Sequence, residues 1–331
     1  MEQEPRPRLL RVTDDSFAAL ITAFRQTSKW TRPQAEGGFA EGTKSNWARE
    51  LDFMSRPDCL GALTIEEIDP SLVQAYFDGI DDRPGKQAIG LSALKLLEKW
   101  AVKRKLLPRQ ITLGIEISES DGSHVPWSDA HVALAEREAD PSLARAVTLA
   151  ANTGQRGSDL IRMGPTDIEV YKGIRGILVK HTQKVKREAW IPITTELSRA
   201  MATWERRPGP FLTQPDGSPW TRKQLSRAWT RERDTNPALA PLRLEALDLD
   251  PVVAPRRDGG LVIHGLRGTA CVRLKRAGAT ELQICDMIVM SPGMVARYCQ
   301  PSKQRDNAAA AVIHLDRTFA ERRSGTGTEN D

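Results

Sequence analysis

Three segments of the chain place a strong anion-binding side chain beside small residues. Arg156 lies in "NTGQRGSDL", and Lys184 lies in "HTQKVKREAWIP" between two expected strands. His264 and Arg267 are three residues apart in "HGLRGTACVRL", so they share one face near the start of an expected helix. A helix N-terminus favours anions, and arginine offers a planar fork of donors to phosphate oxygens. A tyrosine within reach, such as Tyr298 in "MVARYCQ", would then have a phosphorus atom to attack.

Each of these residues also has an ordinary structural explanation. Tyr298 is one of only three tyrosines and could pack a C-terminal helix as a half-buried aromatic. Arg156 could form an ion pair with Asp159, and Lys184 could belong to a solvated, charged hairpin. His264 and Arg267 could serve as a helix cap and a salt bridge. The remaining histidines have no motif around them and are interpreted as ordinary residues: His124, His131, His181 and His314.

Residues 14–106 have the apolar periodicity of helices. The strongest pattern is "AIGLSALKLLEKWAVKRKLLP". Four apolar residues of this segment share one face: Leu91, Leu94, Leu97 and Ala101. Three lysines fall at helical spacing on another face: Lys95, Lys99 and Lys103. A solvated face is the simple interpretation of the lysines, although a basic stripe can also lie against a phosphate backbone.

The composition changes after this helical region and again at the chain ends. Residues 1–13 form an N-terminal extension, and the polar residues 108–126 are interpreted as a linker. A second domain is expected over 127–322, followed by a disordered tail over 323–331. This domain starts with helices, continues with three strand-like segments separated by turns, and returns to helices from about residue 194. The sequence therefore predicts a mainly α protein with a small antiparallel β-sheet.

A second basic stretch, "SPWTRKQLSRAWTRER", lies in the later helical region. Five basic residues are expected to share its polar face: Arg222, Lys223, Arg227, Arg231 and Arg233. A solvated helix explains them, and in a DNA-binding protein they are candidates for contact with the DNA backbone.

The composition excludes several classes of protein. The net charge of +5 and the pI of about 9.1 favour a nucleic-acid partner without establishing one. The start of the chain lacks the apolar core of a signal peptide, and no apolar run is long enough to span a membrane. We therefore expect a cytoplasmic protein. The four cysteines show no C-x-x-C pairing, and nucleotide-binding glycine motifs are absent, so we expect no metal and no cofactor.

The order Arg, Lys, His-x-x-Arg, Tyr over about 140 residues resembles the tyrosine recombinases, the phage-type integrases. The segment "TGQRGSDLIRMGPTDIE" resembles their box with a Thr-Gly turn, a catalytic Arg and an acidic residue three positions on. This resemblance carries over to Arg156 and Asp159. The segment "HGLRGTACVRLKRAGA" resembles the His-x-x-Arg box and assigns His264 and Arg267.

The remaining boxes follow in the same order. In "QKVKREAWIPIT", Lys184 lies seven residues before Ile191, the spacing of the family's hairpin lysine. The segment "MVARYCQ" resembles the nucleophile segment and assigns Tyr298. One position departs from the family, because Met290 stands where His or Trp is usual. A thioether is a poor hydrogen-bond partner for phosphate, although it can pack against the tyrosine.

The resemblance implies a mechanism without metal or cofactor. Tyr298 would attack the scissile phosphate and form a 3′-phosphotyrosyl link. Arg156, His264 and Arg267 would bind the non-bridging oxygens, Asp159 would support the site, and Lys184 would protonate the leaving 5′-oxygen. Residues 14–107 resemble the family's helical, SAM-like core-binding domain, and 127–322 resemble its mixed α+β catalytic domain.

The partners implied are double-stranded DNA, a homotetramer on synapsed DNA and an accessory directionality or DNA-bending factor. The role implied is integration or excision of a mobile element. Three alternatives stay open. The chain could be a resolvase or topoisomerase-like relaxase, or a DNA-binding protein of the same fold with impaired catalysis, as Met290 suggests. It could also be a helical scaffold without a DNA role.

Overall fold

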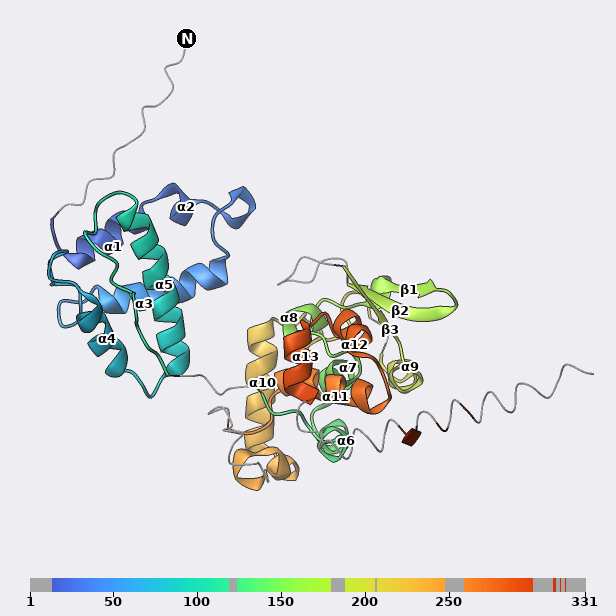
Figure 1. Cartoon of the computed structure of the whole chain (residues 1–331). Coiled ribbons are helices and arrows are strands. Elements are labelled where there is room, and N and C mark those ends of the chain that lie inside the picture. The colour runs from blue at the N-terminus through green and yellow to red at the C-terminus, as the bar shows by residue number, and fades with distance from the viewer. Residues whose placement is uncertain are drawn as a thin grey trace, which may run out of the picture. The chain divides into compact units, whose positions relative to one another are not determined.

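The computed structural model describes residues 14–118, 124–179, 188–205, 207–247 and 259–299, and the single positions 312, 313, 316 and 319. The chain divides into two compact units, the first ending at Ser120 and the second beginning at Asp121 (Figure 1). Each unit has its own hydrophobic core. The expected extension 1–13 and tail 323–331 lie outside the described residues.

The described part of the first unit is helical. Its elements are α1 (Phe17–Arg25), α2 (Ser28–Thr31), η1 (Gln34–Glu36), α3 (Glu41–Met54), α4 (Pro70–Asp78) and α5 (Pro84–Val102). The starts of α1 and α4 are fixed by side-chain caps. Ser16 accepts a hydrogen bond from the N–H of Ala19, and Asp69 accepts one from the N–H of Leu72.

Helix α5 has the two faces that the sequence predicted. The four apolar residues are buried: Leu91, Leu94, Leu97 and Ala101. The three lysines are exposed, with Lys103 just past the helix end: Lys95, Lys99 and Lys103. Gly90 allows α5 to pack closely, because a methyl group there would lie 3.0 Å from Cε of Met54 and 3.3 Å from the ring of Phe77.

The segment after α5 belongs to the first unit for most of its length. The buried carboxylate of Glu98 accepts hydrogen bonds from the N–H groups of Ile111 and Thr112, at 2.6 and 2.7 Å. The N–H of Ser118 donates to Oε1 of Gln87 at 2.9 Å. The sequence predicted a linker over 108–126. Residues 108–118 lie within the first unit, where this polar stretch satisfies backbone N–H groups on buried side chains of α5.

The second unit combines helices with one sheet. Its helices are α6 (Asp129–Glu138), α7 (Pro141–Thr153), α8 (Gly157–Leu160), α9 (Thr195–Ala202), α10 (Arg222–Thr235), α11 (Leu266–Arg276), α12 (Glu281–Ile288) and α13 (Pro292–Cys299). Its 3₁₀ turns are η2 (Pro165–Asp167), η3 (Pro237–Leu242), η4 (Leu244–Ala246) and η5 (Ile263–Gly265). Its strands are β1 (Ile168–Tyr171), β2 (Ile174–Val179) and β3 (Ala189–Pro192).

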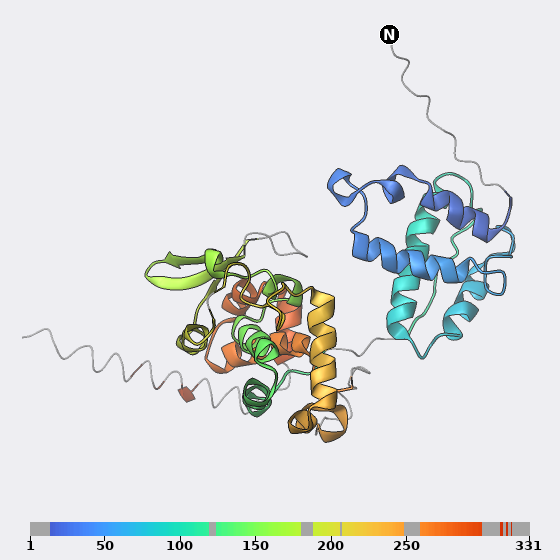
Figure 2. The same cartoon turned by 180° about the vertical axis from the view of Figure 1, so that it is seen from behind.

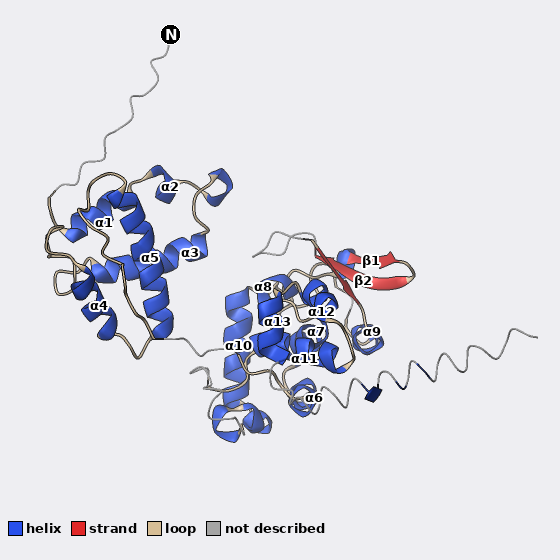
Figure 3. Ribbon diagram, viewed as in Figure 1, coloured by secondary structure: helices blue, strands red, loops and turns tan. Residues whose placement is uncertain are grey.

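The three strands form an antiparallel sheet in the order β1-β2-β3 at one edge of this unit (Figure 3). Ile177 of β2 lies opposite Ile168 of β1 and Ile191 of β3, and Ile177 and Ile191 are fully buried. The indole of Trp190 covers Gly176, where a methyl group would collide with it. The glycine therefore fixes how β3 packs on β2. The fold is mainly α with a small antiparallel sheet, as the sequence predicted.

Helix α7 is central to the second unit and packs against α6, α11 and α10 (Figures 1 and 2). Its buried side chains are small or aliphatic, including Ala146, Val147, Leu149 and Ala150. Small residues let neighbouring helices approach closely. The end of α7 therefore lies beside α11, and this contact brings the turn after α7 to the start of α11. Among the described residues, no helix is both long and apolar enough to cross a membrane.

Candidate functional site

One cavity of about 880 Å³ collects side chains from three separated segments of the second unit. Its lining includes Arg156 before α8, His264 in η5, Arg267 in α11 and Tyr298 in α13. Helices α11, α12 and α13 pack on one another around it. The structure therefore brings together four of the five predicted catalytic residues. The fifth, Lys184, lies outside the described residues.

The Thr-Gly turn places Arg156. Helix α7 ends at Gly154, whose φ of 62° is left-handed. A methyl group there would also lie 3.0 Å from Ala270 and 3.1 Å from Ile288, so the turn approaches α11 and α12 closely. Gln155 is buried and donates to the carbonyl of Met287 at 2.9 Å. Arg156 then becomes the N-cap residue of α8 and faces the cavity.

Both arginines are anchored on backbone carbonyls. Arg267 is 4% exposed and donates to the carbonyl of Gly154 at 2.6 Å and to that of Val289 at 2.8 Å. Arg156 donates through Nη2 to the same Val289 carbonyl at 3.5 Å. Val289 ends α12 in the left-handed region at φ 56°, a conformation that a β-branched residue rarely adopts. This turn directs one carbonyl at two guanidinium groups.

The anchored guanidinium groups keep donors for a ligand. Nη1 of Arg156 is buried and has no hydrogen-bond partner among the described residues. Arg267 has five N–H groups in total and uses two nitrogens on carbonyls. Burial, followed by the charge of Arg156, lowers the pKa of Arg267 to about 10, so it remains charged at neutral pH. Two preoriented cations at one cavity favour an anionic ligand.

His264 is neutral at physiological pH. Burial is the main cause of its lowered pKa, which falls to about 4, and the charges of His124, Arg267, Arg222 and Arg156 add to it. A neutral imidazole has one N–H donor and one acceptor nitrogen. The ring can therefore donate to a phosphate oxygen without adding a further charge to the cluster.

Tyr298 is both packed and at the cavity. It is 5% exposed and belongs to a cluster with Ile284, Ile288 and Val295. Its ring lies over Gly268, where a methyl group would come within 2.7 Å of Cδ1. Tyr298 also lines the cavity with Arg156, Arg267 and His264. Its packing role and its position at the anion site are therefore compatible.

Two comparisons by sequence found nothing, because no protein-family model and no curated protein matches the chain. The fold, however, is similar to solved integrases. A lambda integrase tetramer bound to a Holliday junction matches at 16% identity with a TM-score of 0.67, over 87% of this chain and 79% of that chain. The Tn1549 transposon integrase in complex with circular intermediate DNA matches at 16% identity with a TM-score of 0.67, over 89% and 99%.

The chain has the tyrosine recombinase fold. The resemblance stated from the sequence boxes is thereby confirmed at the level of the fold. Within the tyrosine recombinase fold, Met290 lines the cavity directly after the left-handed Val289. Asp159 is fully buried, and its Oδ1 accepts from Nη2 of Arg162 at 3.1 Å.

The residues of this chain that the sequence predicted to bind DNA fall into three groups. Arg222, Lys223 and Arg227 are exposed on α10, and Arg222 also lies near the cavity, since its charge lowers the pKa of His264. Arg233 was placed on the same basic face by the sequence, and this was wrong. Its guanidinium is fully buried and donates to Asp234 and to the carbonyl of Leu261. The lysines of α5 are exposed on the first unit.

Sequence reasoning missed His124. Its ring contacts the ring of His264 edge to face, with centroids 4.8 Å apart. No motif surrounds His124 in the sequence, and it falls within the segment interpreted as a linker. Its place beside His264 depends on a contact between residues 140 positions apart, which no local pattern records.

Proposed function

We propose that the chain is a site-specific DNA recombinase that cuts and rejoins DNA through a 3′-phosphotyrosyl intermediate. One observation carries this proposal. Arg156, the pair His264 and Arg267, and Tyr298 come from three separate segments and line one cavity. Two anchored arginines, a neutral imidazole and a phenol are the groups that a phosphotransfer to tyrosine needs.

The first step forms a bond between Oη of Tyr298 and the scissile phosphorus. The phenol loses its proton as it attacks, and negative charge grows on the non-bridging oxygens. Free N–H groups of Arg156 and Arg267 bind those oxygens, and His264 donates through one ring nitrogen. Because these donors are held before the substrate arrives, removing one costs about 3–4 kcal/mol of transition-state stabilisation.

The same step breaks the bond between phosphorus and the 5′-oxygen. We assign Lys184 as the general acid that gives this oxygen a proton. The phosphotyrosine retains the energy of the broken bond, so a 5′-hydroxyl from another duplex reverses the step and joins a new strand. No metal or cofactor takes part.

The two units receive different roles. We assign the first unit to DNA binding through the lysines of α5, and the second unit to catalysis. Arg222, Lys223 and Arg227 would contact the backbone of double-stranded DNA.

Exchange between two duplexes cuts four strands and needs four protomers, and the similar lambda integrase is a tetramer on a Holliday junction. The similar Tn1549 integrase belongs to a transposon, which supports a mobile-element role.

A nicked suicide substrate tests this function. The site would come from DNA flanking the gene, and the wild type would be compared with Tyr298→Phe and with the control Tyr171→Phe, whose ring is 57% exposed in β1. Wild type and control should form a covalent protein–DNA adduct, and Tyr298→Phe should form none. An adduct in Tyr298→Phe would refute the assignment.

Met290 favours a second candidate, a DNA-binding protein of this fold with impaired catalysis. Its thioether stands in the cavity where an imidazole or indole N–H could otherwise reach phosphate. Sequence-specific binding by the wild type without any adduct would support this candidate. Adduct formation followed by relaxation of one plasmid, without exchange between two sites, would instead indicate a relaxase.

A further inference from the structure

The segment 124–127 is held firmly over the start of α11. The N–H of Trp127 donates to Oγ1 of Thr269 at 2.7 Å, and that hydroxyl donates to the carbonyl of Trp127 at 3.1 Å. The indole N–H of Trp127 donates to the carbonyl of Val262 at 3.0 Å. The indole is 3% exposed and packs against Trp229, with ring centroids 5.1 Å apart. His124 is therefore three residues from a fixed anchor.

Two glycines let this segment reach the site. A methyl group on Gly265 would collide with the carbonyl of Val125. A methyl group on Gly268 would lie 3.0 Å from Cγ of Pro126 and 2.7 Å from the ring of Tyr298. The same glycine thus accommodates both the segment and the proposed nucleophile. The segment 124–126 therefore packs directly behind residues that line the cavity, although it lies far from them in sequence.

The ring of His124 meets the ring of His264 edge to face, with an interplanar angle of 79° and a centroid separation of 4.8 Å. This arrangement is favourable between aromatic rings because the positive edge of one meets the negative face of the other. It also limits rotation of the His264 ring about its own side chain.

We propose that His124 is a positioning residue that holds the His264 ring in the orientation in which it donates to a phosphate oxygen. The inference rests on the proposed function and adds a residue to its site. It gives the chain a second imidazole near the anion site, from a segment other than the one that carries Met290.

The charges around His264 offer a direct readout of this contact. Burial is the largest cause of the lowered pKa of His264, and the charges of His124, Arg267, Arg222 and Arg156 lower it further. Replacing His124 removes one of these charges, so the titration of His264 should report the contact between the two rings.

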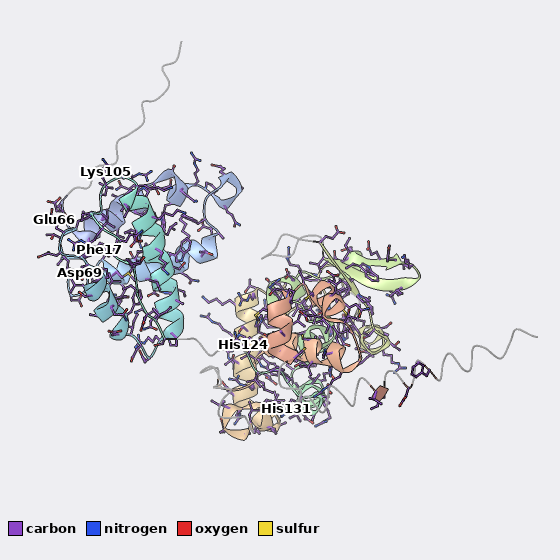
Figure 4. All side chains as sticks on the ribbon, in the orientation of Figure 1. Phe17, Glu66, Asp69, Lys105, His124 and His131 are labelled. Carbon is purple, nitrogen blue, oxygen red and sulfur yellow. The ribbon has the colours of Figure 1, made fainter. Side chains whose placement is uncertain are left out.

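The experiment compares wild type, His124→Phe, His124→Ala and the control His131→Phe. His131 lies on α6, apart from His124 (Figure 4), and its own lowered pKa is caused by burial. The first readout is the single-turnover rate of adduct formation on the nicked substrate from pH 5 to 9. The second is the pH titration of the His264 ring followed by NMR, which requires no DNA. Thermal unfolding confirms that each variant is folded.

We expect His124→Ala to cleave about ten- to a hundredfold more slowly with unchanged DNA affinity, because His264 loses its orientation. His124→Phe keeps an aromatic edge against the His264 ring, so it should retain most of the rate. In both variants the pKa of His264 should rise, and in His131→Phe it should not move.

The outcomes separate this inference from the proposed function. An unchanged His264 titration in both His124 variants would overturn the inference, whether or not the protein cleaves DNA. Wild-type rates for folded His124→Ala across the pH range would overturn it too. Absence of any adduct from the wild type would instead refute the proposed function, and the NMR titration would still decide whether His124 acts on His264.

Discussion

Single residues explain why the site has its present geometry. Gly268 meets Tyr298 and Pro126 at distances that leave no room for a methyl group. Val289 adopts a left-handed conformation, and its carbonyl accepts hydrogen bonds from Arg156 and Arg267. The absence of a side chain at Gly268 thus leaves room for the phenol of Tyr298. The strained turn at Val289 supplies the carbonyl that both guanidinium groups contact. Strain at a site is maintained only when the surrounding packing enforces it, and Val289 is buried in the core of the second unit.

Gly268→Ala is expected to displace the ring of Tyr298. Overpacking of this kind costs about 1–3 kcal/mol of the free energy of unfolding. It should also slow adduct formation, because the phenol would move relative to the arginines. The control is Gly293→Ala in α13, where no atom lies within 4 Å of the added methyl group. Urea unfolding and the rate of adduct formation measure both effects. Equal stability and equal rates in the two variants would contradict the expectation.

At the scale of elements, the ends of helices position the arginines of the site and the carbonyl that they contact. The end of α7 supplies the turn before Arg156, the start of α11 supplies Arg267, and the end of α12 supplies the carbonyl that both arginines contact. In the first unit, the end of α5 fixes the following chain, because Glu98 accepts hydrogen bonds from two buried backbone N–H groups. A buried donor without a partner is costly, so this carboxylate decides where residues 108–118 lie.

Glu98→Ala should therefore loosen the segment after α5. Leaving the N–H groups of Ile111 and Thr112 without a partner is expected to cost about 2–4 kcal/mol of the free energy of unfolding. Amide hydrogen exchange at these two positions should accelerate, while Glu66→Ala at an exposed position should change neither quantity. If exchange at residues 111 and 112 stays slow in Glu98→Ala, another group holds the segment.

At the scale of the whole molecule, the two proposed functions, DNA binding and catalysis, are assigned to different units. Exposed lysines lie on α5 of the first unit, and the cavity lies in the second. Basic residues that neutralise phosphates release counterions, so their number is reflected in how steeply DNA affinity falls with salt. Such a measurement separates contact with the DNA backbone from a merely solvated face.

The triple change Lys95→Ala, Lys99→Ala, Lys103→Ala should weaken DNA binding. If all three lysines contact phosphates, the slope of log affinity against log salt should become shallower by about 3. The triple change to arginine keeps the charges and should leave the slope close to that of the wild type. Affinity measured by fluorescence anisotropy at several salt concentrations gives the slopes. An unchanged slope in the alanine variant would mean that this face of α5 is only solvated.

Much of the fold was predictable because it depends on local patterns. The apolar period of residues 91–101 predicted the buried face of α5, and turn residues separated the three strands. The order of the boxes around Arg156, His264, Arg267 and Tyr298 also indicated the fold. A linear order of motifs is visible in a sequence, since each motif is a short run of residues with its own turn or helix start.

The sequence by itself thus determined the helical and strand segments, the order of the candidate residues and the chemistry that their types permit. Only the tertiary structure decided that Arg156, His264, Arg267 and Tyr298 line one cavity, that the Val289 carbonyl accepts hydrogen bonds from two arginines, and that the ring of His124 contacts that of His264. It also decided that Arg233 is buried, while the other basic residues of α10 are exposed. The physical reason is that burial and contact between distant residues depend on how elements pack, and packing leaves no local signature in the sequence.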